Sequence, residues 1–184
     1  MWLLLPSIRA TTMRSPVVSD SSPLIAFALI DRFSVLRALF PTLWIPDAVV
    51  LASGRVTNPG AGSVEEAVHS GWMQRLTVHD QDAVQRQMGR LHWGEVGVVL
   101  GALEYRIPAV LLDDRYARRL ASAYGLEYTG TVGLLLLAKR RGMIEAVRPL
   151  LTHLTREGFR MSASLYQAVL QSAQEIESVG DHQA

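Results

Sequence analysis

The sequence Pro16-Val17-Val18-Ser19-Asp20-Ser21-Ser22-Pro23-Leu24-Ile25 joins a short apolar stretch to an aspartate and a helix start. Its β-branched residues predict a buried strand over residues 17–20. Ser22 is expected to cap the helix that follows, with Pro23 in the first helical position. In an α/β sheet, a carboxylate at the carboxyl end of a strand lies in the crevice where such folds keep their chemistry. Asp20 is therefore a candidate site residue.

Two further acidic positions resemble this arrangement. The apolar residues 109–112 run directly into Asp113-Asp114 and a helical pattern, and between the two strands Gly94-Glu95 opens another helix with an apolar face. Asp20, Glu95 and Asp114 would thus reach one edge of the sheet from three elements. Carboxylate oxygens suit Mg²⁺ and Mn²⁺, and the chain has no cysteine to hold a softer metal. The pattern predicts a hard-cation site and phosphodiester chemistry.

Each acid also has an ordinary interpretation. Glu95 in a first helical turn favours the helix dipole, Asp113 and Asp114 can cap the helix after them, and Asp20 can be a turn residue. Acids are common at helix N-termini, so each residue taken alone favours the ordinary interpretation. The three acids together, all at positions where strands and helices meet, favour the metal site.

Short strands alternate with helices along the chain, which predicts an α/β fold with a parallel sheet and helices on both of its faces. Strands are expected at 17–20, 72–78, 109–112 and 127–129, with a further apolar triplet at 43–45. Helices are expected at 23–30, 47–52, 82–91, 94–105, 115–125, 132–141, 144–157 and 162–176, and a short one starts at Ser63 as its cap.

The length of 184 residues and the 49% apolar composition indicate one folded domain, expected over residues 16–176. Residues 1–15 are expected to be a disordered leader and residues 177–184 a flexible tail. No apolar run reaches the roughly 18 residues of a membrane span, and the apolar N-terminus is too short for a signal peptide. The absence of cysteine excludes disulfides and permits a reducing cytoplasm, which is the expected location.

Other candidate motifs are weaker. The five histidines show no zinc-ligand spacing, and the glycines at 130 and 133 lack the lysine of a phosphate-binding loop. Thr131 is expected to cap the next helix, although its hydroxyl near the acids could hold a metal-bound water. Trp44, Trp72 and Trp93 are expected in the core or an interface rather than as base-stacking platforms. Seven basic residues against two acids from Arg115 to Arg148 fit an anionic polymer as substrate.

Several of these motifs together resemble one protein family. Residues 17–25 are similar to the first strand and turn of PIN-domain nucleases, where an aspartate ends the strand and a Ser or Thr lies two residues on. The start Gly94-Glu95-Val96-Gly97 resembles the glycine–glutamate helix of one PIN subfamily, and residues 111–121 resemble its acidic strand end. Residues 128–135, 138–144 and 158–162 are similar to its C-terminal half, so the resemblance covers about residues 16–173. Many members of that subfamily are known only as predicted nucleic-acid-binding proteins, and VapC-type relatives are toxins of toxin–antitoxin pairs.

The resemblance implies a PIN-like three-layer fold and a ribonuclease that depends on Mg²⁺ or Mn²⁺. It carries Asp20, Glu95 and Asp114 over as metal ligands and catalytic acids. Asp113 would be an adjacent catalytic acid, and Ser22 would orient Asp20.

The chain departs from the family at one place. On the helix after residues 45–46 the family usually has a glutamate, and this sequence has Leu51 and Ala52 there. Asp47 lies on the same helix a turn earlier and is a poor substitute.

We therefore expect a metal-dependent endoribonuclease that is the toxin of a type II toxin–antitoxin pair, with RNA as substrate, a cognate antitoxin as partner and a homodimeric assembly. The alternative is a catalytically weak or inactive PIN-like module that binds nucleic acid or a partner, as the missing glutamate would permit. A small-molecule phosphotransferase is disfavoured, because no strand leads into a glycine-rich phosphate loop. The residues expected to hold the RNA backbone are Arg115, Arg118, Arg119, Lys139, Arg140 and Arg141.

Overall fold

The computed structural model describes residues 15–53, 61–87, 89 and 91–176, apart from the side chains of residues 51–53 and 61. The expected leader at 1–15, except residue 15, and the expected tail at 177–184 lie outside the described residues. Contacts divide the chain into two compact units, one up to Gly133 and one from Leu134 onward. Each unit is described separately below.

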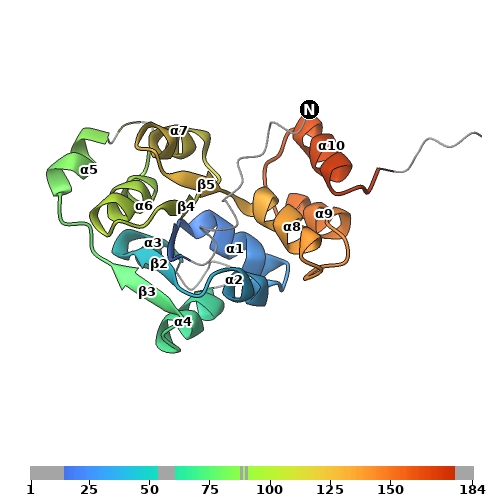
Figure 1. Ribbon diagram of the computed structural model, residues 1–184, viewed down its shortest axis with the longest axis horizontal. Helices are drawn as coiled ribbons and strands as arrows, with labels where there is room; N and C mark the ends of the chain where they lie inside the picture. Colours follow the sequence, from blue (N-terminus) through green and yellow to red (C-terminus); the bar gives the residue numbers. More distant parts are fainter. Residues whose placement is uncertain (1–14, 54–60, 88, 90, 177–184) are drawn as a thin grey trace, which may run out of the picture. The chain divides into compact units, whose positions relative to one another are not determined.

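The first unit is built on an all-parallel sheet with the strand order β3-β2-β1-β4-β5 (Figure 1). This confirms the expected α/β class. The strands are β1 (Val17–Ser19), β2 (Leu43–Pro46), β3 (Met73–Leu76), β4 (Ala109–Leu111) and β5 (Glu127–Thr129).

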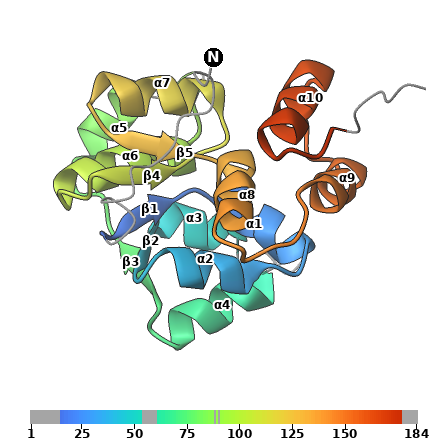
Figure 2. The same cartoon turned by 45° about the vertical axis from the view of Figure 1, so that its right-hand side comes forward.

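Helices connect successive strands and flank the sheet, and α6 and α7 lie beside β4 and β5 (Figure 2). In the first unit the described helices are α1 (Ser21–Leu29), α2 (Phe33–Leu39), α3 (Asp47–Ser53), α4 (Ala61–His69), α5 (Gln81–Gln87), α6 (Trp93–Glu104) and α7 (Arg115–Ala123). Helix α8 (Thr131–Arg140) begins in the first unit and ends in the second, which also contains α9 (Arg148–Arg156) and α10 (Ala163–Ser172).

Strand β1 lies at the centre of the sheet, where the order of the strands reverses. Val17 and Val18 are fully buried, and β1 pairs with β2 on one side and with β4 on the other. The order of the strands therefore reverses between β1 and β4, and in open α/β sheets a ligand crevice forms outside the carboxyl ends of the strands at such a point. Asp20 directly follows β1, and its backbone N–H donates to the Leu111 carbonyl at 3.0 Å.

Two expected helix starts are wrong. Asp20 is the N-cap residue of α1, in an extended conformation, so that Ser22 and Pro23 lie inside the first turn rather than at the cap. Pro23 is tolerated there because the first N–H groups of a helix have no partner within the helix. Ser63 was expected to cap α4, but it lies two residues inside that helix.

Two other expected boundaries are also wrong. Helix α5 ends at Gln87, shortly before Gly89 takes a positive φ of 143°, which turns the chain out of the helix. Helix α9 starts at Arg148 rather than 144, with a proline in its first turn. The Glu175 carboxylate accepts the backbone N–H groups of Val147 and Arg148, both at 2.7 Å, and so satisfies donors that a helix start leaves open.

Substituting Gly130→Ala is expected to destabilise the fold by about 1–3 kcal/mol, the usual cost of overpacking a filled position. An added Cβ would lie 2.7 Å from the carbonyl oxygen of Leu112 and in collision with the side chains of Asp113 and Arg118. The control is Gly62→Ala on α4, where an added Cβ has no heavy atom within 4 Å. That variant should be at least as stable as the wild type, because alanine favours the helix over glycine and Gly62 lies in the first turn of α4. Urea denaturation measures both, and a Gly130→Ala protein as stable as the wild type would contradict the expectation.

Candidate carboxylate site

Asp20 is a buried carboxylate at the carboxyl end of β1. Only 6% of the residue is exposed, and the Ser22 hydroxyl donates to its Oδ2 at 3.3 Å. Burial raises the pKa of Asp20 above its ordinary value, against the opposing effect of nearby backbone amides and Ser22. A carboxylate buried in this way binds a proton or a cation more tightly than a carboxylate in water.

The start of α6 lies against Asp20. A Cβ placed on Gly94 would be 3.5 Å from Asp20 Oδ1 and equally far from Val49, which is ordinary van der Waals contact and places the start of α6 beside Asp20. Glu95 follows in the first turn and accepts the His92 backbone N–H at 3.0 Å through Oε2. Burial raises the pKa of Glu95, and the charges of Asp114 and Asp20 raise it further. Asp20, after β1, and Asp114, before α7, are therefore close enough for their negative charges to raise the pKa of Glu95.

Asp114 is the N-cap residue of α7. Its Oδ1 accepts the backbone N–H groups of Tyr116 at 2.6 Å and Ala117 at 2.9 Å. Asp114 is thus an N-cap, as its ordinary interpretation expects. Only Oδ1 of its two carboxylate oxygens takes part in the cap. An N-cap and a metal ligand can be the same aspartate if Oδ2 faces the metal.

Asp20, Glu95 and Asp114 lie at one edge of the sheet, but their carboxylates are not arranged around a common point where a metal could bind. Among the described side chains, no group of three or more His, Asp or Glu residues is arranged to hold a metal. Glu95 bonds to its own helix start and Asp114 to α7, as given above. The chemical fit to a hard divalent cation is nevertheless good, because the donors are carboxylates and two of them, Asp20 and Glu95, have raised pKa values.

Asp113 belongs to a hydrogen-bonded cluster that ties two strand ends together. Its Oδ1 and Oδ2 accept the Thr131 backbone N–H at 2.9 Å and the Thr131 hydroxyl at 2.6 Å. Arg118 donates to Asp113 Oδ1 at 3.3 Å and, through Nε, to the Leu112 carbonyl at 2.7 Å. Burial raises the pKa of Asp113, while Thr131 and Arg118 act in the opposite direction. Asp113, Thr131 and Arg118 therefore fix the β4–α7 turn to the start of α8.

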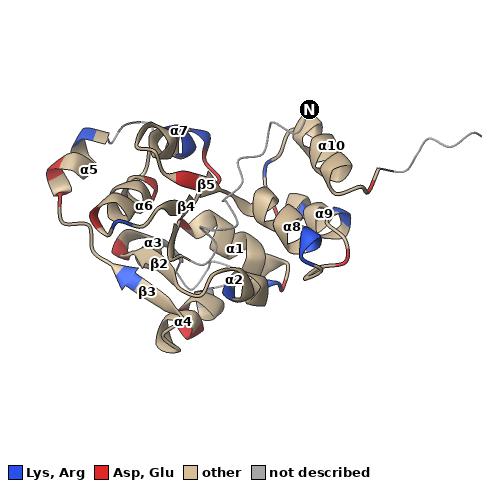
Figure 3. Ribbon diagram, viewed as in Figure 1, with Lys and Arg blue, Asp and Glu red and all other residues tan. Residues whose placement is uncertain are grey.

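The basic residues expected to hold RNA have different environments. Figure 3 shows the blue of Lys and Arg on α7. Arg115 and Arg119 are exposed on α7, with guanidinium carbons 5.1 and 5.8 Å from the centre of the Tyr116 ring. Arg118 is engaged in the cluster with Asp113. In the second unit Lys139 donates to the Ala173 carbonyl at 2.7 Å and to Glu175 Oε1 at 2.5 Å, and only 25% of its side chain is exposed. Arg140 and Arg141 are exposed.

Both carboxylate oxygens of Asp47 accept hydrogen bonds from residues on or next to β3. Oδ1 accepts two bonds from Arg75, at 2.9 and 2.7 Å, and Oδ2 accepts the Thr77 hydroxyl at 2.6 Å. The Thr77 hydrogen bond, followed by Arg75, lowers the pKa of Asp47. The expectation that Asp47 is a poor substitute for the family glutamate agrees with this geometry. The side chains of Leu51 and Ala52 lie outside the described residues.

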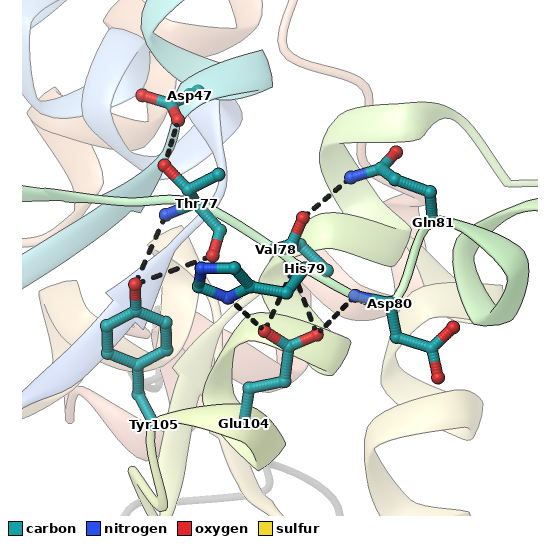
Figure 4. A network of polar contacts seen from close by, with 8 residues as sticks. All are labelled: Asp47, Thr77, Val78, His79, Asp80, Gln81, Glu104 and Tyr105. Carbon is teal, nitrogen blue, oxygen red and sulfur yellow. Dashed lines mark hydrogen bonds and ion pairs between the residues drawn. The ribbon is translucent and has the colours of Figure 1, made fainter.

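Glu104, which the sequence analysis did not identify, is a second acid that holds the segment after β3. Glu104 at the end of α6 accepts the backbone N–H groups of His79 and Asp80, both at 3.0 Å, and contacts the His79 ring at 3.2 Å (Figure 4). The segment after β3 is thus held by Asp47 on α3 and by Glu104 on α6. A glutamate separated by 25 residues from its partner gives no local signal in the sequence.

Comparison with known proteins gives a match over most of the chain. A family model described as a PIN domain, DUF3368, matches residues 16–175. Similar curated proteins include those named probable potassium transport system protein Kup. The one from Anaeromyxobacter dehalogenans strain 2CP-C is 33% identical over 96 residues, 52% of this chain and 14% of that protein. The one from Anaeromyxobacter sp. strain Fw109-5 is 29% identical over 105 residues, 56% of this chain and 15% of that protein.

The chain spans only 14–15% of the length of these curated relatives, so the match carries no transport function to it. No helix in the described part of the chain combines the length and apolar character needed to cross a membrane.

Asp20→Asn is expected to stabilise the metal-free protein at neutral pH. The pKa of Asp20 is raised by folding, so the folded chain binds its proton more tightly than the unfolded chain does. Wild-type stability therefore falls as pH rises from the ordinary value of 3.8 through the folded pKa and stays reduced above it. The advantage of the asparagine variant should be largest at neutral pH and should vanish as pH falls toward 3.8.

Urea denaturation in EDTA across that pH range measures this dependence. Glu66→Gln, an exposed acid on α4, is the control and should show no comparable gain. An asparagine variant less stable than the wild type at neutral pH would contradict the argument from burial.

Proposed function

The chain belongs to the PIN domain family, and from this premise we propose that it is a metal-dependent endoribonuclease whose carboxylates Asp20, Glu95 and Asp114 hold Mg²⁺ or Mn²⁺. Family membership by itself indicates a nuclease-type function. The metal, the choice of RNA and the residue roles are the proposal. A role as the toxin of a type II toxin–antitoxin pair in the cytoplasm, acting as a homodimer with a cognate antitoxin, is part of the same proposal.

The observation that supports this function best is the approach of the α6 start to Asp20. It brings two acids from separate elements to one edge of the sheet, and the charge of a third, Asp114, also acts on Glu95. Mutual repulsion among carboxylates is destabilising without a cation and is relieved when a divalent ion is shared. Glu95 and Asp114 also satisfy N–H groups at helix starts, but capping does not require that the acids lie close enough to raise one another's pKa.

A bound divalent ion would polarise the scissile phosphate and lower the pKa of a water molecule for attack on phosphorus. The chain itself contributes position and charge. Ser22 orients the Asp20 carboxylate, and the cluster of Asp113, Thr131 and Arg118 holds the turn that carries Asp114. Arg115 and Arg119, directly after Asp114, can pair with phosphates of the strand. Glu95 accepts the His92 N–H through Oε2, so Oε1 would be the oxygen that contacts the ion.

Incubation of the protein with an RNA pool and Mn²⁺ should give cleavage that EDTA abolishes. Asp20→Asn and Glu95→Gln should each lower the cleavage rate by more than about 100-fold, because each removes a metal ligand. Glu66→Gln on α4 is the matched control and should cleave normally.

A wild-type protein that binds RNA but does not cut it in Mg²⁺ or Mn²⁺ would support the non-catalytic binding module instead. For the toxin role, induced expression should arrest growth, and co-expression of a neighbouring short reading frame should relieve the arrest.

Replacing Arg115 and Arg119 by alanine should flatten the salt dependence of RNA binding. Each phosphate contact to a single strand contributes about 0.7 to the slope of log affinity against log salt, so two contacts contribute about 1.4. Arg37→Ala is a suitable control, because Arg37 is exposed near the end of α2, which leads to the amino end of β2 at the opposite edge of the sheet. Fluorescence anisotropy at several salt concentrations measures the slopes, and an unchanged slope in the double variant would place the phosphates elsewhere.

A further inference from the structure

Thr131, the first residue of α8, is fully buried, and both of its hydrogen-bond donors serve one carboxylate. Its backbone N–H donates to Asp113 Oδ1 at 2.9 Å, and its hydroxyl donates to Asp113 Oδ2 at 2.6 Å. A hydroxyl has a single proton, so the Thr131 hydroxyl has none left to donate to a metal-bound water. Thr131 is therefore placed to hold Asp113 rather than a ligand.

Asp113 is held by further contacts besides Thr131. Arg118 adds a hydrogen bond to Oδ1 at 3.3 Å, so three of the roughly four acceptor positions of this carboxylate are in use. The Asp113 side chain is only 15% exposed. Gly130 confines it further, because an added Cβ there would collide with Asp113 Oδ1. The carboxylate thus has one defined orientation, turned toward the start of α8.

Asp113 directly precedes Asp114, a proposed metal ligand, and the chain around the two residues is fixed at both ends. Before them, the Leu112 N–H donates to the Thr129 carbonyl at 2.8 Å. After them, Asp114 Oδ1 accepts two backbone N–H groups at the start of α7. Two consecutive aspartates therefore bind the starts of two different helices. A rotation of the backbone in this turn would move both carboxylates, so the hold on Asp113 also sets the direction of Asp114.

We propose that Asp113 and Thr131 are positioning residues, which set the cation affinity of the site by fixing Asp114, and that neither of them contacts the ion. This inference rests on the proposed metal-dependent function. It differs from the expectation that Asp113 is a catalytic acid and that Thr131 holds a metal-bound water. A site residue has to stay within about 0.5 Å of its productive position, and residues that orient metal ligands commonly change metal affinity about 10- to 100-fold.

Thr131→Val tests the positioning role, because it removes the hydroxyl and keeps the backbone N–H and nearly the same volume. We expect Mn²⁺ binding by the full-length protein, measured by isothermal titration calorimetry without RNA, to weaken about 10- to 100-fold. Thr131→Ser keeps the hydroxyl and should bind Mn²⁺ nearly as tightly as the wild type. A role in stability alone would lower the free energy of unfolding of Thr131→Val without changing the Mn²⁺ affinity of the folded protein.

Thr77→Val is the matched control. The Thr77 hydroxyl donates to Asp47 Oδ2 at the same distance of 2.6 Å, and Asp47 is not adjacent in the sequence to a proposed metal ligand. This variant loses an equivalent hydroxyl–carboxylate bond and should leave the Mn²⁺ affinity unchanged. Circular dichroism should show that the variants are folded at the temperature of the titration.

Comparison of Asp113→Asn with Asp114→Asn separates a positioning residue from a ligand. The first substitution keeps an acceptor for the Thr131 N–H, whereas the second replaces a charged ligand by a neutral one. The charge of Asp113 raises the pKa of Asp20, so Asp113→Asn should also weaken Mn²⁺ binding, but less than Asp114→Asn does. This comparison decides the question if Thr131→Val does not fold.

An unchanged Mn²⁺ affinity in folded Thr131→Val overturns the proposal, and so does an equal loss of affinity in Thr131→Ser. A loss in Asp113→Asn as large as the loss in Asp114→Asn would make Asp113 a ligand, which also overturns it. A wild-type protein that binds no Mn²⁺ overturns it as well.

This inference and the proposed nuclease function can fail separately. RNA cleavage by the wild type together with an unaffected Mn²⁺ affinity in Thr131→Val removes the positioning role and leaves the nuclease. Mn²⁺ binding that depends on the Thr131 hydroxyl, without any cleavage of RNA, keeps the positioning role and removes the nuclease.

Discussion

The close approach of α6 to the sheet is the constraint on which the carboxylate site depends. Gly94, Gly97 and Gly101 lie one turn apart on this helix, and an added Cβ on them would meet Asp20, Pro46 and Leu76 respectively. A Cβ on Gly94 or Gly97 would be at ordinary van der Waals distance, and only one on Gly101 would collide, 2.5 Å from the end of the Leu76 side chain on β3. The fit of this helix face against the strands also sets where Glu95 lies relative to Asp20, so the packing of α6 and the electrostatics of the site have a common cause.

The electrostatics in turn work against folding. Burial raises the pKa values of Asp20, Glu95 and Asp113, which means that their ionised forms are less favourable in the folded chain than in water. Asp113 is compensated locally by Thr131 and by the cation Arg118, whereas Asp20 is compensated by the Ser21 and Ser22 amides and the Ser22 hydroxyl and forms no ion pair among the described contacts. A protein that keeps an under-compensated acid at a strand end gives up stability at that position, as functional sites commonly do.

The sequence predicted the strands, the parallel sheet, Asp20 at the end of a strand, and Glu95 and Asp114 at helix starts, because these depend on local periodicity and on the end of each strand. It could not separate roles that depend on distant partners. Asp113 is 18 residues from Thr131, and Lys139 is 36 residues from Glu175, so neither contact has a local signature. Likewise the exposure of Trp93 is decided by what packs around α6, so the sequence left open whether this residue lies in the core or in an interface.

Helix α3 lacks the glutamate that the family usually has there, and this would limit how many ions the proposed site could hold. Residues 48–50 of this helix are Ala, Val and Val, and its first acid, Asp47, is bound to Arg75 and Thr77. The described side chains of α3 therefore bring no free carboxylate toward Asp20. Each divalent ion needs negative ligands to offset its dehydration, and a pair of ions about 3.5–4 Å apart needs more of them to offset the mutual repulsion. With three acids and no contribution from α3, we infer that the arrangement favours one ion, and a second would depend on the substrate phosphate for its negative ligands.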